Sequence, residues 1–285
     1  MCGKTGSWIC KNCTNLFEPA IPECFLCRNI SNNYTIHKKC ATKKNFAKIR
    51  TERSIVCWRY NSIGKKLLSR FKYKGVEEIS HSINELIKQH PNLSLIKKSI
   101  NNSIIAPVPL HFIRQNERGF NQAERIIEAL SGLEGVNVEP IDLFKRVQNT
   151  EKQSCLPYFE RLNNIAGAFK LNDSIKANNI VANSTIATSN DLMKTIPNQF
   201  VKSPKSIKSK EGNVSEKNEK SETIITERDK LNSTRIIIVD DVLTSGSTVN
   251  SLLELLHSSQ LSLERVFGDF SVTVFTLFRG AKDIY

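Results

Sequence analysis

The sequence contains no long apolar run. No stretch approaches the roughly 18 apolar residues that a membrane-spanning helix needs, and the N-terminus lacks the apolar core of a secretory signal. A repeat of the length typical of solenoid proteins is also missing. We therefore expect a cytoplasmic protein that does not insert into membranes. Its 285 residues suffice for one medium domain with an appendage, or for two small domains.

Acidic residues are scarce in the first quarter of the chain. Residues 1–75 hold 16 Lys and Arg against 3 Asp and Glu, whereas the rest of the chain is close to balance, so the net charge of +13 comes from this region. A concentrated basic region is typical of proteins that bind phosphates or nucleic acid. A solvated basic surface has the same composition, and charge alone gives no specificity, so both interpretations stay open.

Aromatic residues are few in residues 172–233, which are rich in Asn, Ser, Lys and Thr. Such a segment buries too little apolar surface to offset the entropy lost on ordering, so it is predicted to be a disordered, low-complexity insert. It contains no recognisable motif, and it separates two regions with patterned apolar residues, 58–171 and 234–285.

Four of the eight cysteines form two C-x-x-C pairs within residues 1–57, a region with few apolar residues that needs a staple in order to fold. In an intracellular chain such pairs favour a metal over disulfides. Two pairs complete a closed, tetrahedral four-thiolate site that suits structural Zn²⁺. The predicted ligands of this zinc-binding module are Cys10, Cys13, Cys24 and Cys27.

Other ligand sets are open as well. A redox dithiol is an alternative use of a C-x-x-C pair. Spare metal-binding side chains lie close in the sequence, namely Cys2, His37 and Cys40.

Apolar periodicity predicts helices and strands in alternation. Helices are expected at 76–89, 121–130 and 249–258, the second of them capped by Asn121. Strands are expected at 103–108, 236–239 and 271–278. Strands that alternate with helices indicate an α/β fold with a mainly parallel, helix-covered sheet.

One predicted strand, Ile236–Val239, runs directly into Asp240 and Asp241. In open α/β sheets ligands bind beyond the carboxyl ends of strands, and two carboxylates suit the vicinal hydroxyls of a ribose. The following turn, Thr244–Thr248, has little side-chain bulk, so its backbone N–H groups can surround a phosphate. The next helix would direct its positive dipole end at the same anion. This pattern predicts a phosphoribose site.

The stretch IIIVDDVLTSGSTV resembles the phosphoribosyl pyrophosphate (PRPP) signature of type I phosphoribosyltransferases. Three further segments, in the same order, resemble the ComF family, and RGFNQA within the second is the most diagnostic. These segments are FKYKG, APVPLHFIRQNERGFNQAERI and KRVQNTEKQSCLPYFERLNNIAGAF. The resemblance covers nearly the whole chain apart from the insert.

The resemblance implies a type I phosphoribosyltransferase fold with a small N-terminal zinc module and a PRPP site that uses Mg²⁺. Asp240 and Asp241 would hold the ribose. The loop that would hold its 5′-phosphate comprises Thr244, Ser245, Gly246, Ser247 and Thr248. The residues that would bind pyrophosphate are Pro107, Val108, Pro109 and Arg118; a proline-stiffened strand exit and a surface arginine are the competing interpretations.

Lys152 and Arg161 match the mobile catalytic loop of such enzymes and would neutralise pyrophosphate as it leaves, although a solvated loop has the same residues. Nothing in the sequence identifies an acceptor.

Three functions follow from these observations. The first is transfer of phosphoribose from PRPP to an unknown base. The second, implied by the family's link to natural competence, is binding of single-stranded DNA beside the DNA-uptake machinery without transfer chemistry. Aromatic residues could then stack on bases, with candidates Trp8, Phe17, Phe25, Trp58, Phe71 and Tyr73. The third is a structural zinc module that docks the sheet domain onto a partner.

Overall fold

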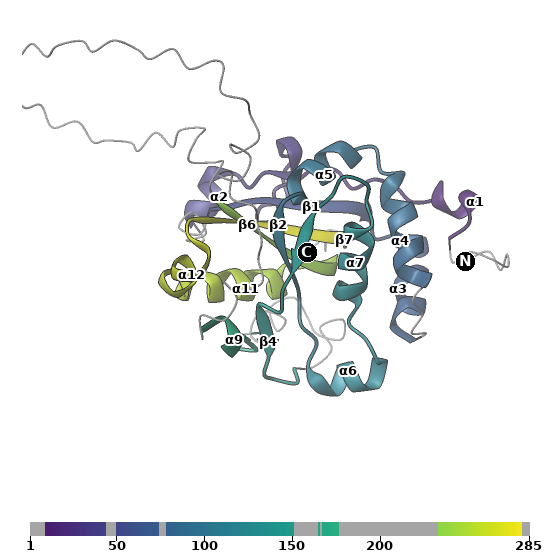
Figure 1. Cartoon of the computed structure of the whole chain (residues 1–285). Coiled ribbons are helices and arrows are strands. Elements are labelled where there is room, and N and C mark those ends of the chain that lie inside the picture. Colours follow the sequence, from purple (N-terminus) through teal and green to yellow (C-terminus); the bar gives the residue numbers. More distant parts are fainter. Residues whose placement is uncertain are drawn as a thin grey trace, which may run out of the picture.

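The computed structural model describes residues 9–43, 50–73, 78–150, 165, 167–176 and 233–280 (Figure 1). Most of the predicted insert at 172–233 lies outside these residues. The described helices include none that is long and apolar enough to span a membrane.

A five-stranded sheet forms the centre of the fold, and every neighbouring pair of strands in it is parallel. The strand order is β1-β7-β6-β2-β3. The bounds are β1 (Thr51–Arg59), β2 (Ser103–Pro107), β3 (Val138–Pro140), β6 (Thr234–Leu243) and β7 (Phe270–Arg279). The prediction of an α/β fold with a mainly parallel sheet is thereby confirmed.

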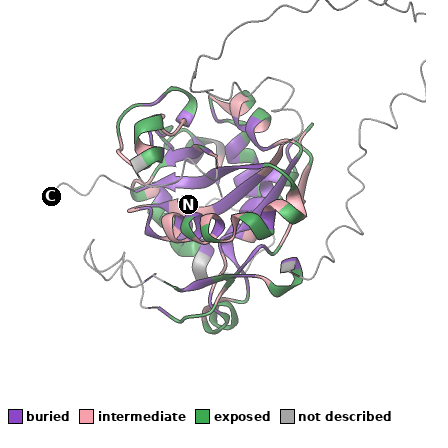
Figure 2. Ribbon diagram, turned by 90° about the vertical axis from the view of Figure 1, so that its left-hand side faces the viewer, coloured by how far each residue is buried: buried purple, intermediate pink, exposed green. Residues whose placement is uncertain are grey.

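Helices cover both faces of this sheet, and the strands between them are buried (Figures 1 and 2). The first apolar core lies under α3 (Ser62–Tyr73), α4 (Glu78–Lys88), α5 (Leu93–Ile100) and α7 (Gln122–Ser131). The second lies under α11 (Ser247–Ser258) and α12 (Gln260–Phe267). The three predicted helices correspond to α4, α7 and α11, and α11 begins two residues earlier than expected.

Strand β6 shows why its sequence is apolar without alternation. Ile237 and Val239 enter the first core, whereas Ile236 and Ile238 enter the second, and all four are fully buried. A strand that is buried on both faces needs apolar residues at every position. Asp240 is therefore the first residue at which the chain leaves the core.

The sequence did not predict β1, which crosses residue 57, the expected end of the N-terminal module. The first half of β1 is polar and shows no strand pattern in the sequence. The inclusion of β1 in the sheet therefore depends on its pairing with β7. The N-terminal segment runs along its outer side: the Ala20 N–H donates to the Cys57 carbonyl at 2.9 Å, and the Arg59 N–H donates to the Glu18 carbonyl at 2.8 Å.

Smaller elements complete the described chain. They are α1 (Lys11–Thr14), a 3-10 turn (Asn32–Tyr34), α2 (Lys38–Lys43), α6 (Phe112–Arg118), the antiparallel pair β4 (Phe144–Arg146) and β5 (Phe169–Leu171), and α9 (Asp173–Lys176).

Phe278 joins the N-terminal segment to the sheet. Its ring is fully buried, with its centroid 6.1 Å from that of Phe17 and 5.9 Å from that of Tyr60. Truncation to alanine would leave a cavity, so we expect Phe278→Ala to lower the free energy of unfolding by about 3–5 kcal/mol in urea denaturation. Leu261→Ala, at a side chain that is 76% exposed, should change it by less than about 0.5 kcal/mol. Equal effects of the two changes would contradict this packing.

Candidate functional site

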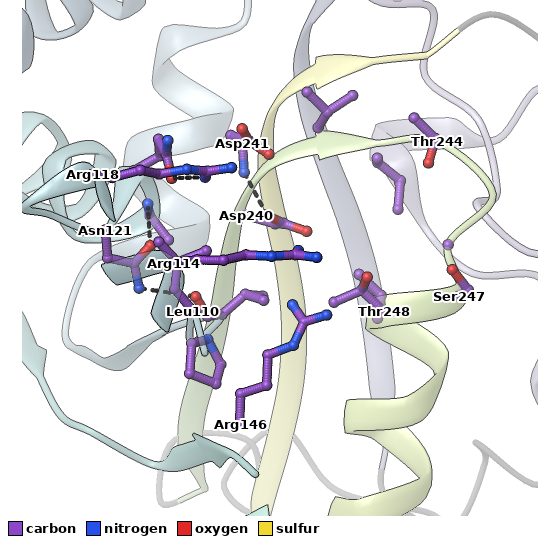
Figure 3. A pocket seen from close by; sticks show the side chains of 18 of the residues that line it. Leu110, Arg114, Arg118, Asn121, Arg146, Asp240, Asp241, Thr244, Ser247 and Thr248 are labelled. Atoms are coloured by element: carbon purple, nitrogen blue, oxygen red, sulfur yellow. Dashed lines mark hydrogen bonds between the residues drawn. The ribbon is translucent and has the colours of Figure 1, made fainter. Parts of the chain in front are cut away.

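A cavity of about 370 Å³ opens at the carboxyl ends of β2 and β6 (Figure 3). One wall is formed by the chain after β2 and by α6 and the start of α7, another by β4, and a third by the end of β6 and the loop into α11. The predicted phosphoribose motif and the RGFNQ segment therefore face the same space, although more than 100 residues separate them in the chain.

Both predicted acids line this cavity. The carboxylate of Asp240 accepts a hydrogen bond from the Asp241 backbone N–H at 2.8 Å. Burial raises the pKa of Asp240 well above its ordinary value, the neighbouring Asp241 charge raises it further, and Arg146 partly opposes both effects. Tyr60 lines the cavity as well, and its pKa is raised first by burial and then by the Asp241 charge. The two acids thus form a site of concentrated negative charge that is set up to accept hydrogen bonds.

Three arginines line the cavity opposite the phosphate loop, namely Arg114, Arg118 and Arg146 (Figure 3). The pKa of Arg146 falls to about 10, mainly because of burial and then because of the charge of Arg114. The pKa of Arg114 is lowered in the same direction, by burial and then by Arg118. Guanidinium groups that repel one another within a cavity gain from an anion between them, and they bind phosphate oxygens with paired N–H donors.

Each arginine is held in place by a neighbour. Arg118 Nη1 donates to Gln122 Oε1 at 3.1 Å. Arg114 and Arg146 both donate to Thr150, the former to its carbonyl and the latter to its hydroxyl. Thr150 is the first residue of the predicted catalytic loop and the last one before the undescribed residues 151–164, so two of the cavity's cations are anchored at the start of that loop.

The RGFNQ segment has a structural explanation at each position. Gly119 ends α6 with a φ of +80°, a conformation that favours glycine. Phe120 is buried, with its ring centroid 5.8 Å from that of Phe71. Asn121 caps α7 by accepting from the Ala123 N–H at 3.0 Å, and its amide donates to the Val108 carbonyl at 3.0 Å. Asn121 therefore ties the strand exit after β2 to the start of α7.

That strand exit lies at the cavity as predicted. Val108, Pro109 and Leu110 line it, whereas Pro107 is still part of β2.

The predicted phosphate loop forms the opposite wall. Gly246 caps α11 with a φ of +79°, so the turn into the helix favours glycine. The N-terminal end of α11 lies at the cavity, which places the positive end of the helix dipole there. Four of the five predicted loop residues line the cavity, and the fifth, Ser245, has its hydroxyl 3.1 Å from that of Ser247.

Two predicted catalytic residues, Lys152 and Arg161, lie outside the described residues. Arg114, Arg146 and Tyr60 were missed by the sequence analysis. Arg114 precedes Arg118 by four residues and so shares its helix face, a signal that could have been used. Arg146 and Tyr60 carry no such signal, because only the packing of β4 and β1 brings them to the cavity.

A second cluster, at the N-terminal module, can hold a metal ion such as zinc. The ligand atoms of Cys24, Cys27, His37 and Cys40 all lie within 4.8 Å of one another, and Cys27 Sγ is 3.3 Å from His37 Nδ1. Three thiolates and an imidazole are a common tetrahedral zinc set. Burial and then the neighbouring thiols raise the pKa of Cys40 to about 11, a crowding that a bound cation relieves.

This cluster contains one of the two predicted cysteine pairs, Cys24 and Cys27, and does not include the other, Cys10 and Cys13. Cys10 and Cys13 flank the start of α1 and pack into the first apolar core, where Cys13 is buried. The segment that follows runs along β1 and carries Cys24 away from them. His37 and Cys40, the spare ligands of the sequence analysis, complete the group instead.

The metal assignment predicts that substitutions of two partly exposed cysteines, Cys40 and Cys10, differ in their effect on Zn²⁺ affinity. Cys40→Ser should lower the affinity for Zn²⁺ by at least about tenfold, because a ligand is lost, whereas Cys10→Ser should retain wild-type affinity. Competition with a chromogenic chelator, together with metal analysis of the purified chains, measures both. A Cys10→Ser variant that loses zinc as readily as Cys40→Ser would restore the four-cysteine set.

Because the pKa of Asp240 is raised, replacing this aspartate with a neutral residue should increase the free energy of unfolding. The folded protein keeps the Asp240 proton to a higher pH than the unfolded chain, so ionisation of this group destabilises the fold as pH rises. Asp240→Asn should therefore raise the free energy of unfolding by about 0.5–2 kcal/mol at pH 7. The gain should shrink as pH falls and disappear below about pH 3, where aspartate is protonated in both states.

Urea denaturation across this pH range measures the effect, with Asp173→Asn, at a side chain that is 77% exposed, as the control. An Asp240→Asn protein that is less stable than the wild type at pH 7 would contradict the assigned direction of the pKa shift.

The chain was compared with known proteins. No family model matches it. It is 26% identical to competence protein ComFC of Bacillus subtilis (strain 168) over 132 residues, which cover 43% of this chain and 51% of that protein. The chain thus spans about half the length of the curated relative it matches. Together with the RGFNQA and IIIVDDVLTSGSTV segments, this relative supports the resemblance of the chain to the ComF family.

Proposed function

We propose that this protein binds PRPP, or a nucleotide that carries a 5′-phosphoribosyl group, in the cavity. The observation that carries the proposal is that three kinds of group line one cavity: the carboxylates of Asp240 and Asp241, the 244–248 loop at the start of α11, and three arginines (Figure 3). PRPP has the matching groups, with a 5′-phosphate at one end, pyrophosphate at the other and hydroxyls between.

Each part of the ligand has a partner. The carboxylates of Asp240 and Asp241 accept hydrogen bonds from the ribose hydroxyls. Backbone N–H groups of the loop and the start of α11 bind the 5′-phosphate, where the helix dipole favours an anion. The arginines bind the pyrophosphate, and Mg²⁺ carried in with PRPP shares its charge.

Transfer chemistry is the further step of the proposal. The bond between ribose C1 and the pyrophosphate oxygen breaks, and a nucleophilic atom of the acceptor bonds to C1 and releases its proton to water. The arginines stabilise the negative charge that develops on the departing pyrophosphate. Lys152 and Arg161, from the predicted catalytic loop, would add to this stabilisation. The acceptor's chemical class is left to experiment.

A second candidate is binding of single-stranded DNA without transfer, which the relative's name as a competence protein favours. Of the six predicted stacking residues, Trp8 and the side chain of Tyr73 lie outside the part of the chain that the structure describes. Phe17, Phe25, Trp58 and Phe71 are buried and unavailable to bases. Phe112 is 64% exposed on α6, two residues before Arg114, and could stack on a base whose phosphate enters the cavity.

Calorimetry with PRPP and Mg²⁺ tests directly whether the arginines that line the cavity bind the ligand. Arg146→Gln should weaken PRPP binding by about 10–100-fold, because it removes a charged hydrogen-bond donor. Lys145→Gln is the matched control, since Lys145 is the preceding residue of β4, is exposed and lies 3.5 Å from Asp173. Equal losses in both variants, or no PRPP binding by the wild type, would reject the proposed site.

Transfer and DNA binding are tested with the same protein. Release of pyrophosphate from PRPP with a panel of bases would support transfer, whereas tight PRPP binding without release with any base tested would limit the protein to binding. Titration with single-stranded DNA at two salt concentrations tests the second candidate. Salt-dependent binding that Phe112→Ala weakens and that PRPP displaces would favour it.

A further inference from the structure

The buried Arg279 lies behind the phosphate loop, at the end of β7. The side chain is only 7% exposed. Its Nη1 donates to the Leu243 carbonyl at 3.1 Å and to the Thr244 carbonyl at 3.2 Å. These are the last residue of β6 and the first residue of the phosphate loop. Arg279 therefore holds the point at which the strand becomes the loop.

The partner of Arg279 comes from the candidate metal centre. Arg279 Nε forms an ion pair with the carboxylate of Glu23, whose side chain is 18% exposed. Glu23 immediately precedes the metal-ligand candidate Cys24. A buried arginine is costly unless a counter-charge accompanies it, so that the position of Glu23 decides whether Arg279 can stay in place.

The other flank of the same C-x-x-C turn is tied to the same region. Arg28 follows Cys27, and its Nη2 donates to the Gly280 carbonyl at 3.0 Å. Gly280 in turn donates its N–H to the Leu243 carbonyl at 3.0 Å. A Cβ atom on Gly280 would lie 3.0 Å from the Thr244 side chain, so these segments are in close contact.

A third contact comes from within the turn. The ring of Phe25 is buried and lies 3.6 Å from the position that a Cβ atom on Gly246 would take. Gly246 is the residue whose positive φ turns the loop into α11. The turn at 24–27 thus supports the phosphate loop at its beginning through Arg279 and at its end through Phe25.

We propose that Glu23 and Arg279 are positioning residues that couple the metal centre to the phosphate loop. A metal ion at Cys24 and Cys27 fixes the turn, the turn fixes Glu23, and Glu23 keeps Arg279 on the two carbonyls. This inference rests on the proposed function in so far as the loop binds the phosphate of a ribose phosphate. Loss of the metal, or of the ion pair, releases the loop and weakens that binding.

Hydrogen exchange of the full chain tests the coupling without any ligand. In metal-loaded Glu23→Gln, amides at 243–248 should exchange at least tenfold faster than in the wild type, and removal of metal from the wild type by a chelator should give the same increase. Metal content of Glu23→Gln, and its hydrogen exchange at amides away from residues 243–248, should match the wild type, which separates positioning of the loop from a general loss of structure.

Two further variants sharpen the test. Glu18→Gln is the matched control, because Glu18 and Arg59 also join the N-terminal segment to the sheet, but both side chains are 60% exposed and neither lines the cavity. It should leave exchange at 243–248 unchanged.

Arg279→Lys keeps the positive charge beside Glu23 but loses the paired N–H donors to the two carbonyls. It should accelerate loop exchange even if Glu23→Gln does not fold. Wild-type loop exchange in Arg279→Lys, or in the metal-free protein, would overturn the coupling.

Calorimetry with ribose 5-phosphate connects the coupling to binding. Glu23→Gln should weaken the affinity by about tenfold and Glu18→Gln should not change it. If the wild type itself fails to bind ribose 5-phosphate, the proposed function fails, while the exchange result still decides the coupling. The two ideas are therefore separable.

Discussion

The burial of β6 between two layers of helices is the constraint on which the rest of the site depends. The strand has paired neighbours on both edges and apolar cores on both faces, which fixes the position of its buried run from Ile236 to Val239. Asp240 and Asp241 follow within the strand, which ends at the buried Leu243, and the loop into α11 comes next. A fixed strand end thus gives the two carboxylates and the 244–248 loop a defined separation.

Charge is concentrated in the cavity at some cost to the unliganded fold. The pKa of Asp240 is raised by burial and by Asp241, and that of Arg146 is lowered by burial and by Arg114. Carboxylates lie next to carboxylates and guanidinium groups next to guanidinium groups. The attraction between the two kinds of group offsets the repulsion within each kind only in part. Such an arrangement favours a ligand that carries anionic groups at its ends and hydroxyls in its centre, and it trades stability of the empty protein for binding.

The N-terminal module is continuous with this site. It packs along β1, and its metal-ligand turn reaches the back of the phosphate loop through Glu23, Phe25 and Arg28. A metal ion in this module has a structural route to ligand binding.

The sequence by itself determined the features that depend on short-range order. The uninterrupted apolar run of β6, the acids and small residues after it, the Asn121 cap and the pairing of Cys24 with Cys27 all follow from local spacing, because strand burial, helix capping and turn geometry act over a few residues. Only the tertiary structure decided which groups meet. It placed β1 in the sheet, brought His37 and Cys40 to Cys24 and Cys27, lined the cavity with Arg114 and Arg146, and set Arg279 behind the 244–248 loop. These contacts depend on strand order and packing between distant segments, which no local spacing encodes.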